Sequence, residues 1–191
     1  KNISKFSDTI SKIVENVFIP ICAGGGIRNI ADAELLFNSG ADKILLNSSL
    51  FENPNLVSEL VKIYGSQSIV ASIDYKIKGD SSIVYINDGS IEIKMSLQSY
   101  IEHVQSLGIG EIYLNSIDKD GTGFGYDFDT INKVINGINV PLIIAGGAGN
   151  ESHLLEGLKL EKVNAVATAN LFNFMGNGLP LARNMLISNK I

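Results

Sequence analysis

Three aspartates of this chain stand at positions where a carboxylate could transfer protons. Asp74 directly follows the apolar run Ile69–Ile73, and Asp118 and Asp120 follow a second predicted strand. A carboxylate at a dry strand end can have a pKa that suits proton transfer. Aspartates at such positions also cap helices or order loops, and the segment Asp120–Thr122 could instead surround a phosphate. The residue types leave these interpretations open.

Two glycine-rich segments offer a second kind of chemistry, the binding of an anion. Leu142–Gly149 is an apolar run that ends in glycines before a helical pattern, and Pro20–Gly26 has the same layout 121 positions earlier. Loops with almost no side chains bring backbone N–H groups and a helix N-terminus close to an anion. One such loop is weak evidence, because tight turns use glycine for steric reasons. Two copies predict two anion sites.

The other reactive residue types do not form a recognisable constellation. His103 and His153 lie on separate predicted helices with no partners at ligand spacing, so we expect packing or surface roles and no metal ion. Cys22, the single cysteine, lies in an apolar run and is expected to be a buried, inert thiol. The chemistry on offer is therefore acid–base catalysis on a phosphorylated substrate.

The composition limits the classes of function. With 191 residues, 45% of them apolar, the chain can bury a substantial core. Its formal net charge of −5 and its scattered lysines give no basic surface for nucleic acid or acidic membranes. No apolar run is long enough to span a bilayer. These features predict a cytoplasmic protein that binds neither nucleic acid nor membrane.

Apolar periodicity divides the chain into alternating helices and strands. Helices are predicted at 6–16, 30–38, 54–63, 96–107, 127–135, 151–158 and 179–187. Strands are predicted at 18–23, 43–47, 68–73, 111–115, 141–145 and 163–169. Such alternation, with strands that are apolar on both faces, is typical of a parallel sheet covered by helices.

Local signals refine these elements. Asn29, Asn53, Ser96 and Asp127 are expected to cap or open the helices that follow them. Strands at 83–86 and 91–94 flank the sequence Asn-Asp-Gly-Ser, which is a strong hairpin signal. We expect this hairpin to decorate one strand-to-helix loop.

An internal repeat favours a barrel over an open sheet. Segments 20–48 and 141–170 match unit by unit, each with a strand, a glycine loop, a helix, a strand and a small polar pair. Two equal halves suit a two-fold symmetric (β/α)8 TIM barrel, whereas an open doubly wound sheet has one switch point. Only about six of the eight units are visible, so we expect a single barrel domain over 1–191 that is incomplete at its N-terminus.

The chain resembles the cyclase subunit of imidazole glycerol phosphate synthase, the HisF family of histidine biosynthesis. The motifs that carry the resemblance are Gly24–Ile27, Gly40–Lys43, Ser72–Asp74, Ser116–Thr122, Gly125–Asp127 and Gly146–Gly149. The family is a (β/α)8 barrel and a lyase that takes ammonia from a glutaminase subunit and uses no cofactor. Its substrate is a linear ribulosyl aminoimidazole carboxamide ribotide with a phosphate at each end. The resemblance thus implies one substrate phosphate for each glycine loop.

The resemblance also implies roles for individual residues. Asp74 takes the place of a catalytic carboxylate that acts as general acid and base in ring closure. The residues implied for one phosphate are Gly26, Asn47 and Ser48, and those for the other are Asp120, Gly121, Gly147, Ala169 and Asn170. Lys43 and Glu111 match a charged ring that gates ammonia entry, and Asp42 falls where the family contacts its glutaminase.

Departures from the family's pattern keep other functions open. The family's second catalytic aspartate belongs to a first strand that this sequence lacks, so we expect the sequence as given to be inactive. Asn170 replaces a usual serine, and Asn115 and the segment 145–150 look more like a surface-sugar branch of the family. Members of that branch pass ammonia from a glutaminase to a sugar amidotransferase in surface-polysaccharide or flagellin-glycan synthesis. The pathway's ribotide isomerase is a third alternative, which Lys43 and Glu111 disfavour because it needs no ammonia gate.

Overall fold

The structure of the chain is a computed structural model that describes residues 2–169, 171 and 176–191. It forms two compact units. Unit 1 comprises Lys1–Ser72 and His103–Glu111, and unit 2 comprises Ile73–Glu102 and Ile112–Ile191.

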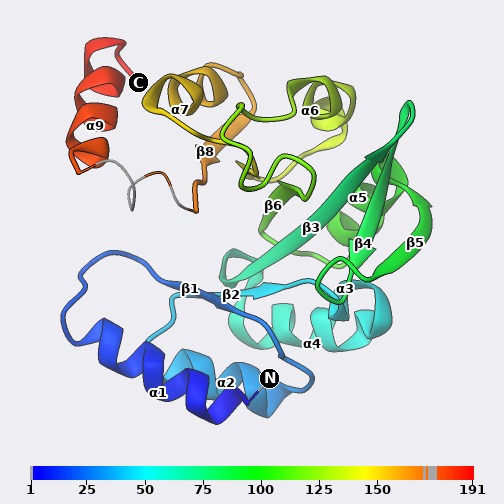
Figure 1. Cartoon of the computed structure of the whole chain (residues 1–191). Helices are drawn as coiled ribbons and strands as arrows, with labels where there is room; N and C mark the ends of the chain where they lie inside the picture. Colours follow the sequence, from blue (N-terminus) through cyan, green and yellow to red (C-terminus); the bar gives the residue numbers. More distant parts are fainter. Residues whose placement is uncertain (1, 170, 172–175) are drawn as a thin grey trace. The chain divides into compact units, whose positions relative to one another are not determined.

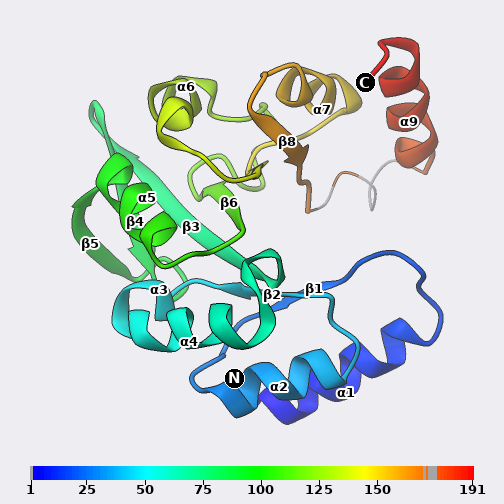
Figure 2. The same ribbon diagram turned by 180° about the vertical axis from the view of Figure 1, so that it is seen from behind.

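Unit 1 is a small parallel sheet with helices on one face. Its elements are α1 (Ile3–Val14), β1 (Cys22–Gly24), α2 (Ile30–Asn38), β2 (Lys43–Leu46), α3 (Ser49–Glu52), α4 (Pro54–Tyr64), the 3-10 turn η1 (Ser66–Ser68) and the start of β3 (Ile69–Lys78). β1 pairs with β2 and β2 pairs with β3, both parallel. Helices α1, α2 and α4 lie on the same side of β1 and β2 in both views (Figures 1 and 2). Ile44, Leu46 and Leu60 are fully buried between these layers.

The helix starts of unit 1 form as the sequence predicts. The Asn29 side chain accepts a hydrogen bond from the N–H of Asp32 at 2.9 Å, and α2 spans the predicted residues. The Asn53 side chain accepts one from the N–H of Leu56 at 3.2 Å, with Pro54 as the first helical residue of α4. These caps form because donor and acceptor lie three residues apart, so the local sequence suffices to place them.

The prediction of a buried strand from residue 18 is wrong at its start. β1 begins at Cys22, and the side chains of Phe18 and Ile19 are 96% and 71% exposed. Cys22 is exposed as well, rather than buried. The reason is tertiary: in the part of the chain that the structure describes, β1 has a strand partner on its β2 side only.

Unit 2 combines a parallel sheet with an antiparallel hairpin. Its elements are the rest of β3, β4 (Ser81–Ile86), β5 (Ile91–Ser96), the start of α5 (Leu97–Ser106), most of β6 (Glu111–Ser116), α6 (Phe128–Val134), the 3-10 turn η2 (Ile135–Gly137), β7 (Leu142–Ala145), α7 (Glu151–Leu158), β8 (Val163–Val166) and α9 (Gly178–Ser188). β6 pairs with β7 and β7 with β8 in parallel, and the buried residues Ile112, Leu142 and Ile144 lie on these strands. Ser96 and Asp127 act as the predicted caps, because their side chains accept hydrogen bonds from the N–H groups of Ser99 and Thr130.

The hairpin is present, but it changes the end of β3. The sequence predicts that this strand ends before Asp74, whereas β3 continues to Lys78. The extension forms because β4 offers an antiparallel partner, with Asp74 opposite Tyr85 and Lys78 opposite Ser81. Asp74 therefore lies within a strand and not at its end.

The fold class agrees with the prediction. Parallel strands alternate with helices along the chain, as in the (β/α) units of a TIM barrel, and the hairpin is an insertion in one such unit. None of the helices among the described residues is long and apolar enough to cross a membrane.

Candidate functional site

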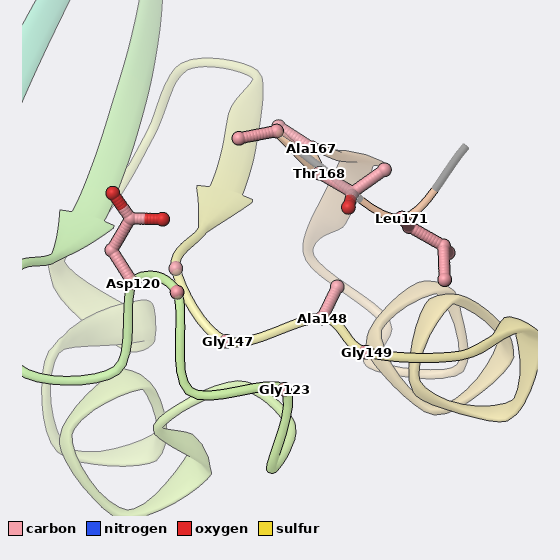
Figure 3. Close-up of a pocket in the computed structure, with 11 residues that line it drawn as sticks. Asp120, Gly123, Gly147, Ala148, Gly149, Ala167, Thr168 and Leu171 are labelled. Atoms are coloured by element: carbon pink, nitrogen blue, oxygen red, sulfur yellow. The ribbon is translucent and has the colours of Figure 1, made fainter. Parts of the chain in front are cut away.

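The loops after β6, β7 and β8 enclose a pocket of about 200 Å³ in unit 2. Figure 3 shows it bordered by Asp120, by the loop Gly147–Gly149, and by Ala167, Thr168 and Leu171. Its lining residues are Asp120, Gly121, Gly123, Gly146, Gly147, Ala148, Gly149, Ala167, Thr168, Ala169 and Leu171. Four residues predicted to bind a phosphate therefore line one pocket: Asp120, Gly121, Gly147 and Ala169. The fifth, Asn170, lies outside the described residues.

Glycine is required in this pocket because two loops pack backbone against backbone. Gly147 has a φ of +108°, and a Cβ there would come within 2.1 Å of the Gly125 carbonyl oxygen. The Gly125 N–H also donates a hydrogen bond of 2.8 Å to the Gly147 carbonyl oxygen. A Cβ on Gly149 would lie 2.2 Å from the Gly123 oxygen. The glycine loop is thus fixed by its neighbour before any ligand binds.

The start of α7 completes the loop. The Asn150 side chain accepts a hydrogen bond from the His153 N–H at 3.0 Å, and His153 Nδ1 accepts one from the Gly149 N–H at 3.0 Å. Across the described residues, no group accepts a hydrogen bond from the N–H of Gly147 or Ala148. Backbone N–H groups at a helix start are suited to binding an anion.

The Asp74 side chain is hydrogen-bonded within unit 2. Its Oδ1 accepts a hydrogen bond of 3.0 Å from the Asn115 side chain on β6, and its side chain is half-buried. Burial raises the pKa of the Asp74 carboxyl, the Asn115 hydrogen bond opposes that rise, and the charges of Asp120 and Asp88 add to it. A carboxyl whose pKa is raised keeps its proton more readily, which suits a general acid.

A buried network supports the strand that carries Asp74. The hydroxyl of Tyr75 donates a hydrogen bond of 3.1 Å to Asp127 Oδ2, while Asp127 Oδ1 caps α6. Both residues are buried. Asp118, the second aspartate singled out by its position, accepts a hydrogen bond of 2.6 Å from the Ile77 N–H and so orders the extended end of β3. Asp118 therefore has the loop-ordering role.

Unit 1 contains the other glycine loop. Gly25 and Gly26 have φ values of +103° and +86°, close to the +89° and +108° of Gly146 and Gly147. At the end of β2, the Asn47 side chain donates a hydrogen bond of 3.1 Å to the Ser72 carbonyl oxygen. The Ser48 hydroxyl donates a hydrogen bond of 3.4 Å to Asn47 Oδ1.

Two charged residues of unit 1 pair at the starts of their strands. Lys43 Nζ and Glu111 Oε2 form an ion pair of 2.6 Å. Next to Lys43, Asp42 accepts a hydrogen bond of 2.7 Å from the Ile21 N–H and donates its own N–H to the Ile21 oxygen at 2.8 Å. Cys22 is close enough for Glu111 to affect it: loss of hydration, and then the Glu111 charge, raise the pKa of the thiol to about 11.

The two histidines have structural partners. His103 Nε2 lies 3.1 Å from the Leu50 carbonyl oxygen in unit 1, and His153 caps the Gly149 N–H in unit 2. Within the described part of the chain, no three His, Cys, Asp or Glu residues group as metal ligands would.

The sequence did not single out Thr168 or the contact between Asn115 and Asp74. Thr168 is the one polar residue in Ala165–Ala169, and a polar residue within an apolar strand end is the signal that could have identified it. The contact between Asn115 and Asp74 joins residues 41 positions apart and depends on the pairing of strands, so no local pattern predicts it.

The fold and the loops define the class of this protein: an α/β protein of the TIM-barrel type with a duplicated strand–glycine-loop–helix–strand unit. A family model described as "Histidine biosynthesis protein" matches residues 1–176. The chain therefore belongs to the histidine biosynthesis protein family, in which its relatives carry the name HisF.

Three relatives illustrate the match. The chain is 44% identical over 183 residues to a protein of Parasynechococcus marenigrum with the provisional name imidazole glycerol phosphate synthase subunit hisF2. That alignment covers 96% of this chain and 68% of the relative. It is 39% identical to the imidazole glycerol phosphate synthase subunit HisF of Hydrogenobaculum sp., over 96% of this chain and 73% of the relative. It is 41% identical to the HisF subunit of Pyrobaculum aerophilum, over 88% and 66% of the two chains.

Proposed function

We propose that this protein is the cyclase subunit of an imidazole glycerol phosphate synthase, a lyase that uses ammonia from a glutaminase partner. The observation that carries the proposal is the duplicated glycine loop, one in each unit, with matching left-handed glycines and matching helix caps. A substrate with a phosphate at each end needs two such loops. The relatives named as synthase subunits support the same activity.

In this proposal Asp74 transfers protons during ring closure. Its raised pKa lets the protonated carboxyl give a proton to the substrate, and the carboxylate can then take one back. The Asn115 side chain keeps the carboxyl oriented, since its amide donates to Oδ1.

Lys43 and Glu111 are proposed to form part of the gate through which ammonia enters. The two charged side chains form an ion pair of 2.6 Å at the starts of β2 and β6. Asp42, on the residue before Lys43, has an exposed side chain and is proposed to contact the glutaminase.

The test is cyclase activity with an ammonium salt, on protein expressed from its complete reading frame. Asp74→Asn keeps the size of the side chain and removes its proton-transfer capacity. We expect it to lower kcat by at least about 100-fold and to leave phosphate binding intact. Formation of imidazole glycerol phosphate from the bis-phosphorylated ribotide is the measurement.

The matched control is Asp80→Asn, an exposed aspartate on the hairpin turn of the same unit. It should retain full turnover. If Asp74→Asn also retains turnover, the role proposed for Asp74 is wrong.

A second function is favoured by one contact and one relative. The Asn115 side chain donates a hydrogen bond to the Asp74 carboxyl, and an asparagine at this position resembles the surface-sugar branch of the family. The relative with the hisF2 name also points away from a single role for the family. In that case the protein would bind a glutaminase and pass ammonia to a sugar amidotransferase. Stimulation of a glutaminase partner, without cyclase turnover on ammonium salt, would select this function.

A further inference from the structure

Thr168 carries a polar side-chain atom that has no partner among the described residues. Its Oγ1 is buried, and no described residue forms a hydrogen bond with it. Thr168 lines the pocket in unit 2, and Figure 3 shows its hydroxyl pointing toward the glycine loop. Buried hydroxyls in proteins are almost always hydrogen-bonded, so an unpartnered one requires an explanation.

The repeat shows that the fold itself does not require this hydroxyl. The Ile21 N–H donates to the Asp42 side chain in the first copy, and the Leu142 N–H donates to the Asn164 side chain in the second. These matched bonds set the alignment of the two copies. Counting four residues along each strand from the acceptor, the position of Thr168 is filled by Leu46 in the first copy.

Leu46 is 1% exposed, and a leucine side chain has no polar atom to satisfy. The same backbone thus accepts an apolar residue at this position. The threonine is a feature of the second copy and faces the second loop.

The described residues that line the pocket in unit 2 carry no positive charge. None of its described lining residues is a lysine, arginine or histidine, and the one ionisable residue is Asp120. The donors that the described lining residues offer to an anion are therefore neutral ones. The loop supplies the N–H groups of Gly147 and Ala148, and among the described lining residues Thr168 alone has a side-chain donor.

We propose that Thr168 donates its hydroxyl proton to the phosphate held by the glycine loop of unit 2, and that this donor distinguishes the second phosphate site from the first. The proposal rests on the proposed function, because it assumes that this loop binds a phosphate group. It adds a phosphate-binding residue at a position where the first copy has leucine.

The experiment compares Thr168→Val with Thr168→Ser in a titration with inorganic phosphate, followed by amide chemical shifts in ¹H–¹⁵N spectra. Valine has the shape of threonine without the hydroxyl, and serine keeps the hydroxyl. The amides of Gly147 and Ala148 report on the second loop, and those of Gly25 and Gly26 report on the first within the same sample.

We expect Thr168→Val to raise the apparent Kd at Gly147 and Ala148 about tenfold, which is the effect of losing one hydrogen bond to a charged group. Thr168→Ser should stay within about twofold of the natural protein. The apparent Kd at Gly25 and Gly26 should not change in either variant. Thr168→Ala serves as a second hydroxyl-free variant if the two valine methyl groups crowd the pocket.

Three outcomes would overturn the proposal. They are equal binding at Gly147 with and without the hydroxyl, a serine variant as weak as the valine variant, and a loss at both loops together. Phosphate-induced shifts at neither loop in the natural protein would instead remove the anion sites themselves, and with them the proposed function. The failure of the inference is thus distinguishable from the failure of the function beneath it.

Discussion

The two copies of the repeat, 20–48 in unit 1 and 141–170 in unit 2, share a backbone and differ in the side chains that line it. Both helices begin at an asparagine with nearly the same backbone angles, −153° and 173° at Asn29 and −157° and 173° at Asn150. In both, the first strand is tied to the second by an N–H donated to a side-chain oxygen, on Asp42 or on Asn164. The scaffold is therefore set by the same few bonds twice.

One difference between the copies concerns the charge at the start of the second strand. At the start of the second strand the first copy has Asp42 and Lys43, which take part in an interstrand bond and in an ion pair with Glu111. The second copy has the uncharged Asn164 and Ala165 there. The second strand therefore starts with charged residues in the first copy and with uncharged residues in the second.

The largest expected effect concerns the residue before the left-handed glycines, which is Gly24 in the first copy and Ala145 in the second. A Cβ on Gly24 would lie 2.7 Å from the Leu45 oxygen and 3.1 Å from Leu45 Cδ2. The counterpart of Leu45 is the smaller Ala167. We expect Gly24→Ala to lower the free energy of unfolding by about 2 kcal/mol through overpacking, measured by urea denaturation followed by circular dichroism.

Adding Leu45→Ala to Gly24→Ala sharpens this comparison, because the double variant has the alanine pair of the second copy. The double variant should lose about 1 kcal/mol less free energy of unfolding than the two single variants lose together. The relief is partial because Leu45→Ala removes only the Cδ2 contact. Ala145→Gly is the reverse control and should cost about 0.5 to 1 kcal/mol without any coupling to Ala167. Strictly additive losses of stability at Gly24 and Leu45 would show that the Leu45 side chain is not the reason why position 24 requires glycine.

A smaller effect is expected at the third helical residue, Asp32 in α2 and His153 in α7. The Asp32 carboxylate accepts a hydrogen bond of 2.8 Å from the Arg28 N–H, where His153 Nδ1 accepts from Gly149. A carboxylate also interacts favourably with the positive end of a helix, which a neutral imidazole does not. Asp32→Ala should therefore cost about 1 kcal/mol and His153→Ala about half of that.

Hydrogen exchange in the first turns of α2 and α7 measures this difference locally. Each alanine variant should speed exchange in its own helix and leave the other unchanged. Equal effects at the two positions would contradict a contribution of the Asp32 charge.

The smallest structural effect is expected at Cys22, which corresponds to Ile143 in the second copy. Its thiol pKa is raised from 9.0 to about 11, so the folded protein holds the thiolate fraction at pH 8 about 100-fold below that of the unfolded chain. Alkylation by iodoacetamide should be slow at pH 8 and should accelerate as the pH rises toward 11. The urea-unfolded protein is the matched control, because it contains the same single cysteine.

The Cys22 residue is exposed, although its surroundings remove part of the hydration of the thiol. Glu111→Gln removes the charge that contributes to the rise, so it should lower the pKa and speed labelling at pH 8. Labelling at the rate of the unfolded chain would contradict the raised pKa.

The sequence by itself determined the elements whose bonds are local. Asn29, Asn53, Ser96 and Asp127 cap the helices that follow them because each acceptor lies three residues from its donor. The alternation of apolar strands and amphipathic helices likewise predicted the fold class, since it follows from a periodicity within each segment. The internal repeat likewise predicted both glycine loops, because it can be read in the sequence alone.

Only the tertiary structure decided which side chains meet. Asp74 lies inside β3 because a hairpin partner extends that strand, and it contacts Asn115 because β6 brings in a residue 41 positions away. Cys22 is exposed, despite its apolar neighbours in sequence, because β1 has a described partner on one side only. Thr168 has no hydrogen-bond partner among the described residues, because most of the described residues that line its pocket are glycines and alanines from three loops. Local sequence fixes bonds over a few residues, whereas burial and long-range pairing depend on what the rest of the chain places nearby.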